Sequence, residues 1–154
     1  MTSLKSFCGV SDSLQHDPIS VWAYLKPILM QIRSEYPEVD TLHFYSDGPS
    51  SQYKQKMNFY LFSIEVFDHG FKQASWNFHA AGHGKGIPDG IGASVKRSAD
   101  LKSETWSRYC NVTDLCKQIW EANSSVNVYL IKEKDILDIE SKVRSSNLKT
   151  IPEP

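Results

Sequence analysis

The sequence predicts an α/β protein whose mostly parallel sheet is flanked by helices. Short apolar runs alternate along the chain with segments in which apolar residues recur at helical spacing. This alternation is typical of parallel sheets, because the crossover between parallel strands is usually a helix. The 154 residues are 40% hydrophobic, which is enough for one sizeable core. Residues 1–145 are therefore expected to form a single domain, and 146–154 a frayed tail.

The chain begins with a predicted strand and a predicted helix. Ser6–Asp12 ("SFCGVSD") is a run of apolar and small residues that polar residues end. Asp17 before Pro18 indicates a helix start, because its carboxylate can accept hydrogen bonds from the first turn, where proline is tolerated. Helical spacing continues to about Tyr36, with a kink expected at Pro27.

The next predicted strand is Thr41–Ser46 ("TLHFYS"), which the turn residues Asp47–Pro49 end. Ser51 to about Phe67 suits both a helix and a strand, and the spacing of its apolar residues favours the helix. Gly70 is expected to close that helix.

Two strands and three helices are predicted in the rest of the chain. In order they are a strand at Ala74–Ala80, a helix from about Asp89 to Leu101, a helix at Val112–Ala122, a strand at Val126–Ile131 and a last helix marked by Ile136, Ile139 and Val143, with Asp135 as its expected cap.

Composition limits the classes of function. The formal net charge is −1, so any binding of nucleic acid must be local, and the middle third is the only net-positive part. The three cysteines have no CxxC spacing, and no apolar leader precedes them, which predicts an intracellular rather than a secreted protein. No apolar run is long enough to span a bilayer, so no membrane association is expected.

Candidate functional residues follow the predicted strands. Asp12, Asp47 and the loop His83–Asp89 each come after a strand, and the carboxyl ends of parallel strands are where sites gather. Asp47 and Asp89 are the carboxylates that could hold Mg²⁺ or Mn²⁺ for phosphodiester chemistry. Each also has a structural interpretation, because aspartate is common in turns and at helix starts.

The loop "HGKGIPDGIG" has unusual backbone freedom. Gly90 and Gly92 fall where a helix should begin, at a cost of about 1 kcal/mol each relative to alanine, so something is expected to approach closely. Another strand and a phosphate backbone explain this equally well. Lys85, Lys96 and Arg97 could contact phosphates or could form a solvated face.

Two blocks carry a family resemblance. "HFYSDGPSSQYKQKMNFYLFS" and "WNFHAAGHGKGIPDGIGASVKRSAD" resemble transposon-derived proteins with ribonuclease H-like cores of the DDE/DDD transposase type. The resemblance runs from about Phe7 to Leu101. It implies a polynucleotidyl transferase that uses acidic residues to hold magnesium. Asp47 would be the second carboxylate and Asp89 the third.

The resemblance also implies a nucleic-acid interface. Gln52, Tyr53 and Lys54 would lie beside the second carboxylate, and His83 and Lys85 would line the approach to the third. DNA is the expected partner, RNA is an alternative, and a transposase-like role implies a nuclear location.

This chain departs from the family pattern at its start. "SFCGVSD" resembles the third strand of the ribonuclease H-like meander, whose first strand carries the first carboxylate. The expected fold is therefore a truncated ribonuclease H-like fold, the C-terminal portion of a transposase core. Asp12 is a weak substitute because it follows the wrong strand.

Three functional hypotheses follow. The first is a transposase- or integrase-like remnant that is inactive alone and self-associates through an exposed sheet edge. The second is a domesticated nucleic-acid- or protein-binding module without catalysis. The third is a fragment with no selected activity.

Overall fold

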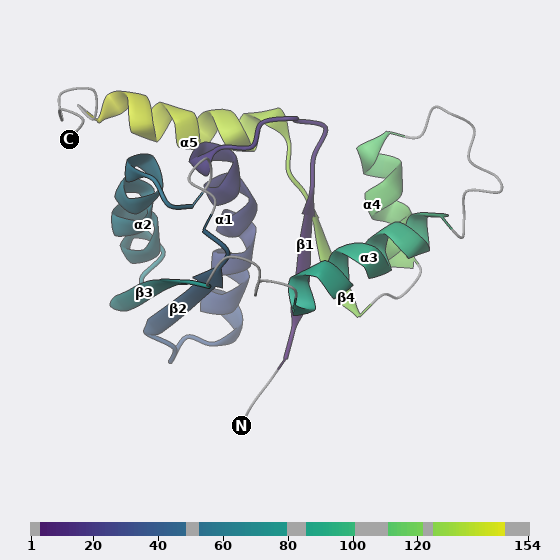
Figure 1. Cartoon of the computed structure of the whole chain (residues 1–154), viewed down its shortest axis with the longest axis horizontal. Helices are drawn as coiled ribbons and strands as arrows, with labels where there is room; N and C mark the ends of the chain where they lie inside the picture. Colours follow the sequence, from purple (N-terminus) through teal and green to yellow (C-terminus); the bar gives the residue numbers. More distant parts are fainter. Residues whose placement is uncertain (1–3, 49–52, 80–85, 101–110, 122–124, 147–154) are drawn as a thin grey trace. The chain divides into compact units, whose positions relative to one another are not determined.

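The computed structural model describes residues 4–48, 53–79, 86–100, 111–121 and 125–146. In these ranges the strands and helices alternate along most of the chain (Figure 1). The strands are β1 (Ser6–Val10), β2 (Thr41–Ser46), β3 (Gln73–Phe78) and β4 (Val126–Leu130). The helices are α1 (Pro18–Glu35), α2 (Lys56–Asp68), α3 (Ile87–Asp100), α4 (Val112–Glu121) and α5 (Glu133–Ser145).

The described strands form two small parallel sheets. β1 pairs with β4, and Ser6 is opposite Val126. β2 pairs with β3, and Phe44 is opposite Trp76. The predicted α/β class with parallel strands is confirmed, but the strands lie in two sheets of two strands each.

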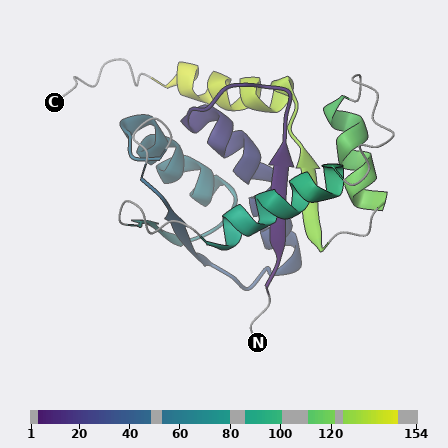
Figure 2. The ribbon, with the colours of Figure 1, turned by 45° about the vertical axis from the view of Figure 1, so that its right-hand side comes forward.

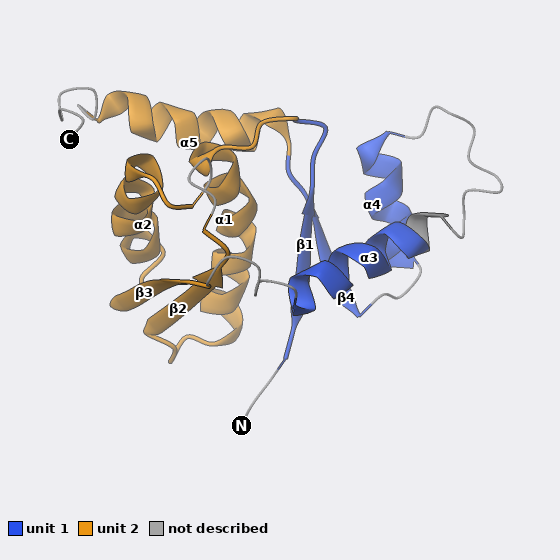
Figure 3. Cartoon of the chain, viewed as in Figure 1, with its two compact units in different colours: residues 1–13, 85–131 blue, residues 14–84, 132–154 orange. Residues whose placement is uncertain are grey.

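The described chain divides into two compact units (Figure 3). Unit 1 contains residues 1–13 and 85–131, and unit 2 contains residues 14–84 and 132–154. Each unit is assembled from two segments that are distant in the sequence. A single domain over 1–145 stays a prediction, and residues 147–154 of the expected tail lie outside the described ranges.

In unit 2, α1 begins where the sequence predicted. The Asp17 carboxylate accepts a hydrogen bond from the Ser20 N–H at 2.9 Å, and the Ser20 hydroxyl accepts one from the Asp17 N–H at 3.1 Å. This reciprocal capping satisfies two N–H groups at the helix start. α1 then continues through Pro27 to Glu35 and packs beside α5 (Figures 1 and 2).

A polar contact in the core of unit 2 joins α1 to α2. The Trp22 indole N–H donates to the Asn58 side-chain oxygen at 2.8 Å, and both residues are 1% exposed or less. The Asn58 amide donates in turn to the Tyr53 carbonyl at 2.8 Å. Buried polar groups are costly when they lack partners, so this chain of bonds makes the packing of the two helices specific.

Unit 1 has its own small core. Cys116 and Ile119 of α4 pack with Val126 and Val128 of β4, and all four are buried. Partly buried apolar residues of β1, α3, α4 and β4 cover this cluster: Cys8, Val10, Ile91, Val95, Leu115 and Leu130.

Three helix starts differ from the sequence predictions. α2 begins at Lys56 rather than near Ser51, because the Asn58 amide holds the Tyr53 carbonyl ahead of the helix. α3 begins at Ile87, two residues before Asp89, with a proline in its first turn. α5 begins after Lys132.

The prediction that Asp135 is the cap before the last helix is therefore wrong in its position. Asp135 lies in the first turn of α5, where its carboxylate accepts from the Lys132 N–H at 2.8 Å. The expected end of α2 is confirmed, because Gly70 has a φ of +87°, a conformation that favours glycine.

Over the residues that the structure describes, none of the helices combines the length and the apolar character needed to cross a bilayer.

Candidate functional site

Asp47 lies where the sequence predicted it, directly after the last residue of β2. Its side chain is exposed. The preceding Ser46 hydroxyl donates to the Asp47 carbonyl at 2.7 Å and accepts from the Trp76 indole N–H at 2.9 Å. The carboxyl end of β2 is thus tied to β3 through side chains as well as through the sheet.

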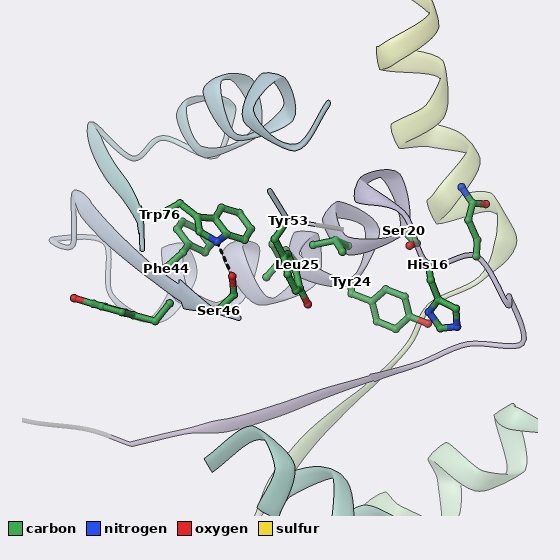
Figure 4. A pocket seen from close by; sticks show the side chains of 11 residues that line it. His16, Ser20, Tyr24, Leu25, Phe44, Ser46, Tyr53 and Trp76 are labelled. Carbon is green, nitrogen blue, oxygen red and sulfur yellow. Dashed lines mark hydrogen bonds between the residues drawn. The ribbon is translucent and has the colours of Figure 1, made fainter. Parts of the chain in front are cut away.

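A pocket of about 440 Å³ opens at this end of β2 (Figure 4). Its volume falls in the range of roughly 300–1,000 Å³ that is typical of small-molecule sites. Every lining residue that the structure describes belongs to unit 2, from α1 and the residues just before it, from β2 and β3, and from the segment before α2. The lining residues are Gln15, His16, Ser20, Val21, Tyr24, Leu25, Phe44, Tyr45, Ser46, Tyr53 and Trp76.

The aromatic floor of the pocket is held in place on several sides. The Phe44 and Trp76 rings stack with centroids 5.0 Å apart and planes 11° from parallel. Trp22 and Phe62 meet Trp76 edge-on, at 5.9 Å and 5.7 Å between centroids. Such edge-to-face contacts stabilise beyond simple burial, so the floor is organised before any ligand arrives.

Polar groups of two kinds line the pocket. The Ser20 and Ser46 hydroxyls are already hydrogen-bonded to the chain. Within the described residues, the Tyr24 and Tyr53 hydroxyls and the His16 ring have no hydrogen-bond partner. These three groups can therefore bind a ligand without giving up a bond that holds the fold.

Tyr53 connects the pocket to Asp47. Its ring lies 5.8 Å from that of Trp76. Burial raises the pKa of the Tyr53 hydroxyl above its ordinary value, and the negative charge of Asp47 raises that pKa further. Tyr53 therefore stays protonated near neutral pH and can donate a hydrogen bond.

Lys54 follows Tyr53 and is exposed. Its side chain passes close to Gly48, where an added Cβ would lie 3.9 Å from the Lys54 Cδ. The predicted neighbourhood of Asp47, Tyr53 and Lys54 is therefore present in unit 2. Gln52 lies outside the described residues.

Asp89 lies in unit 1, exposed in the first turn of α3. Its backbone N–H donates to the Gly86 carbonyl at 3.1 Å. Lys96 and Arg97 are exposed further along the same helix. His83 and Lys85 are outside the described residues, so their predicted roles stay predictions.

Gly90 and Gly92 of α3 have no close neighbours among the described atoms. A Cβ added at Gly90 or Gly92 would have no described atom within 4 Å. No described strand therefore requires glycine at these positions. Close approach by a nucleic-acid backbone, the other interpretation, stays a prediction.

The two predicted metal ligands come from different units. Asp47 belongs to unit 2 and Asp89 to unit 1. Within the described ranges, no three His, Cys, Asp or Glu side chains are grouped so that they could hold a metal ion. A shared magnesium or manganese site stays a prediction.

The sequence did not predict the pocket. His16 precedes and Tyr24 belongs to a helix whose start was predicted, but nothing local indicates that they line the same pocket as Trp76. The useful pattern was the density of aromatic residues in "HFYS" and "SWNFH", which β2 and β3 bring side by side.

The comparisons with curated proteins and with solved structures gave no match for this chain. A family model described as "Domain of unknown function (DUF8701)" matches residues 1–153. Because this match spans almost the whole sequence, the chain belongs to the DUF8701 family.

Proposed function

We propose that this chain is a nucleic-acid-binding domain derived from a transposase- or integrase-like core of ribonuclease H-like fold. The observation that carries the proposal is the environment of Asp47. An exposed carboxylate follows a parallel strand, next to an exposed lysine and an aromatic pocket. Sites of α/β proteins gather at this end of parallel strands.

The two sequence blocks that resemble transposon-derived proteins support the same proposal, since the first contains Asp47 and Lys54 and the second contains Asp89, Lys96 and Arg97. In the proposed core, Asp47 and Asp89 would hold Mg²⁺ or Mn²⁺. The ion would supply charge stabilisation for phosphodiester chemistry. DNA is the proposed partner, RNA is the alternative, and a nuclear location follows if the protein is transposase-like.

A second candidate is a binding module without catalysis. It is favoured by the pocket, because the described lining residues all come from unit 2 and none of them carries a carboxylate. Such a module would need neither Asp89 nor a metal ion. Self-association through a sheet edge is part of both candidates, since strand edges that lack a partner favour association.

The test is the binding of a fluorescent single-stranded DNA oligonucleotide and its RNA counterpart over a series of salt concentrations. Binding through phosphates should weaken steeply as salt rises. Lys54→Gln should weaken binding and reduce the salt dependence, whereas Lys134→Gln, on the exposed face of α5, is the matched control. Absence of binding to both nucleic acids in low salt would refute the proposal.

The double variant Asp47→Asn/Asp89→Asn separates the two candidates. A metal-dependent core should lose the part of its nucleic-acid affinity that added magnesium provides. A binding module should be indifferent to both the substitutions and the ion.

A further inference from the structure

The pocket of unit 2 has a composition that selects its ligand. We propose that it binds one unpaired base of a single-stranded nucleic acid, stacked beside Trp76 and hydrogen-bonded by tyrosines that line the pocket. This inference rests on the proposed nucleic-acid binding and adds to it a base-binding site in which neither aspartate takes part.

The first argument is the aromatic floor of the pocket. Stacking on aromatic side chains is the main way in which proteins hold unpaired bases, and it tolerates any base because each has a π-face. Phe44 and Trp76 supply a stacked pair, and Tyr53 adds a third ring at 5.8 Å from Trp76. The Trp76 ring is also fixed by its hydrogen bond to Ser46, so little freedom is lost when a base binds.

The second argument is the set of free polar groups. A base differs from an aliphatic ligand in having donors and acceptors along its edge. Tyr24, Tyr53 and His16 line the pocket with groups that have no partner among the described residues (Figure 4). A tyrosine hydroxyl both donates and accepts, so these groups match the mixed edge of a base.

The third argument is charge. Among the described residues, the pocket lining contains no lysine, arginine, aspartate or glutamate, so it suits a neutral ring rather than a phosphate. A candidate for a phosphate contact is Lys54, which is exposed and adjacent in sequence to Tyr53. Tyr53 would then contact the base inside the pocket, and Lys54 would contact the phosphate of the same nucleotide outside it.

The experiment uses the full chain and two labelled DNA oligonucleotides of equal length. One is oligothymidylate, and the other has abasic sites in its central positions, so it keeps the phosphates and loses the bases. The parent protein should bind the intact oligonucleotide about tenfold more tightly, as expected for loss of base stacking.

The pocket is then blocked. Val21→Phe places a ring in the pocket from α1, and Met30→Phe, on the exposed side of the same helix, is the matched control. Val21→Phe should bind both oligonucleotides with the affinity that the parent has for the abasic one. Met30→Phe should keep the preference for bases, and circular dichroism should show both variants folded. If Val21→Phe does not fold, Tyr24→Phe, which removes only a hydroxyl, should still lower the preference for bases.

The outcomes separate this inference from the proposed function. Equal binding of intact and abasic DNA by the parent, with normal salt dependence, would overturn the base pocket and leave nucleic-acid binding in place. Failure to bind both DNA oligonucleotides and the RNA counterpart in low salt would refute the proposed function. Saturable binding of thymidine or adenosine, lost in Val21→Phe, would then show that the pocket takes a free nucleoside, and it would overturn the inference that the base belongs to a nucleic-acid strand. Competition by N-acetyl-tryptophanamide equal to that of the nucleosides would overturn it in favour of a protein side chain.

Discussion

The Lys142 ammonium of α5 lies 2.6 Å from the Glu65 carboxylate of α2, and the Glu65 side chain is only 1% exposed. Asp68 lies 3.6 Å from the same ammonium. A buried carboxylate needs a partner, because its desolvation is otherwise not compensated. This pair therefore fixes α5 against α2 within unit 2.

Lys142→Met should destabilise the protein by about 2 kcal/mol, the scale of a hydrogen bond to a charged group. The expected loss of stability is moderate because the Lys142 side chain is 44% exposed and water screens part of the interaction. Urea unfolding measures the change, with Lys134→Met on the exposed face of α5 as the control. If both variants lost the same stability, the ion pair would not be the cause.

The same pair predicts a loss of stability at high pH. Burial lowers the pKa of Lys142, but the hydrogen bond and negative charge of Glu65, with Asp68, outweigh it and raise the pKa above the ordinary 10.5. The pair's contribution is therefore complete below the ordinary pKa and is lost as pH rises through the higher folded value. The stability difference between the parent and Lys142→Met should shrink above about pH 10.5. A difference that is constant between about pH 8 and pH 12 would contradict this.

Sequence reasoning succeeded where the information is local. The Asp17 cap, the end of β2 at Ser46 and the glycine after α2 each depend on residues only a few positions apart. The start of α2 was missed because it depends on a side-chain bond from Asn58 back to the Tyr53 carbonyl, which apolar spacing does not reveal.

The sequence did not predict which strands pair with each other. β1 pairs with β4, so Ser6 lies opposite Val126, and periodicity carries no information about partners so far apart. For the same reason, the sequence predicted only part of the candidate site. The position of Asp47 follows from its own strand, whereas the pocket needs α1, β2 and β3 to come together.

Asp47→Asn should lower the pKa of Tyr53 without returning it to the ordinary 10.0. Burial is the larger cause of the raised pKa and remains in the variant, while the charge of Asp47 is removed. Ultraviolet titration of tyrosinate, taken as the difference between each protein and its Tyr53→Phe derivative, isolates this one group. An unchanged Tyr53 titration in Asp47→Asn would show that the carboxylate does not act on the pocket.

Cys8 and Cys116 should react slowly with a thiol reagent at neutral pH. Burial raises the pKa of both thiols above the ordinary 9.0, and in Cys116 the nearby Cys8 raises it further. The thiolate is the reactive form, so both are protected. In a Cys110→Ser background, Cys8 should react first, because Cys116 is only 1% exposed.

Mass spectrometry after timed labelling gives the order of reaction. Labelling in urea is the control, since both thiols should then react at similar rates. Fast labelling of Cys116 in the folded protein would mean that the core of unit 1 opens readily.

The isolated 154-residue chain should show no appreciable magnesium- or manganese-dependent cleavage or strand transfer. The two carboxylates, Asp47 and Asp89, are fewer than the anionic ligands that the resemblance implies for the transposase core. A loosely held ion cannot orient both the attacking water and the leaving oxygen. The measurement incubates purified chain with labelled DNA and RNA at several metal concentrations, beside Asp47→Asn/Asp89→Asn. Robust turnover by the parent and none by the double variant would contradict the prediction, and Asp12→Asn would then test whether Asp12 is the third ligand.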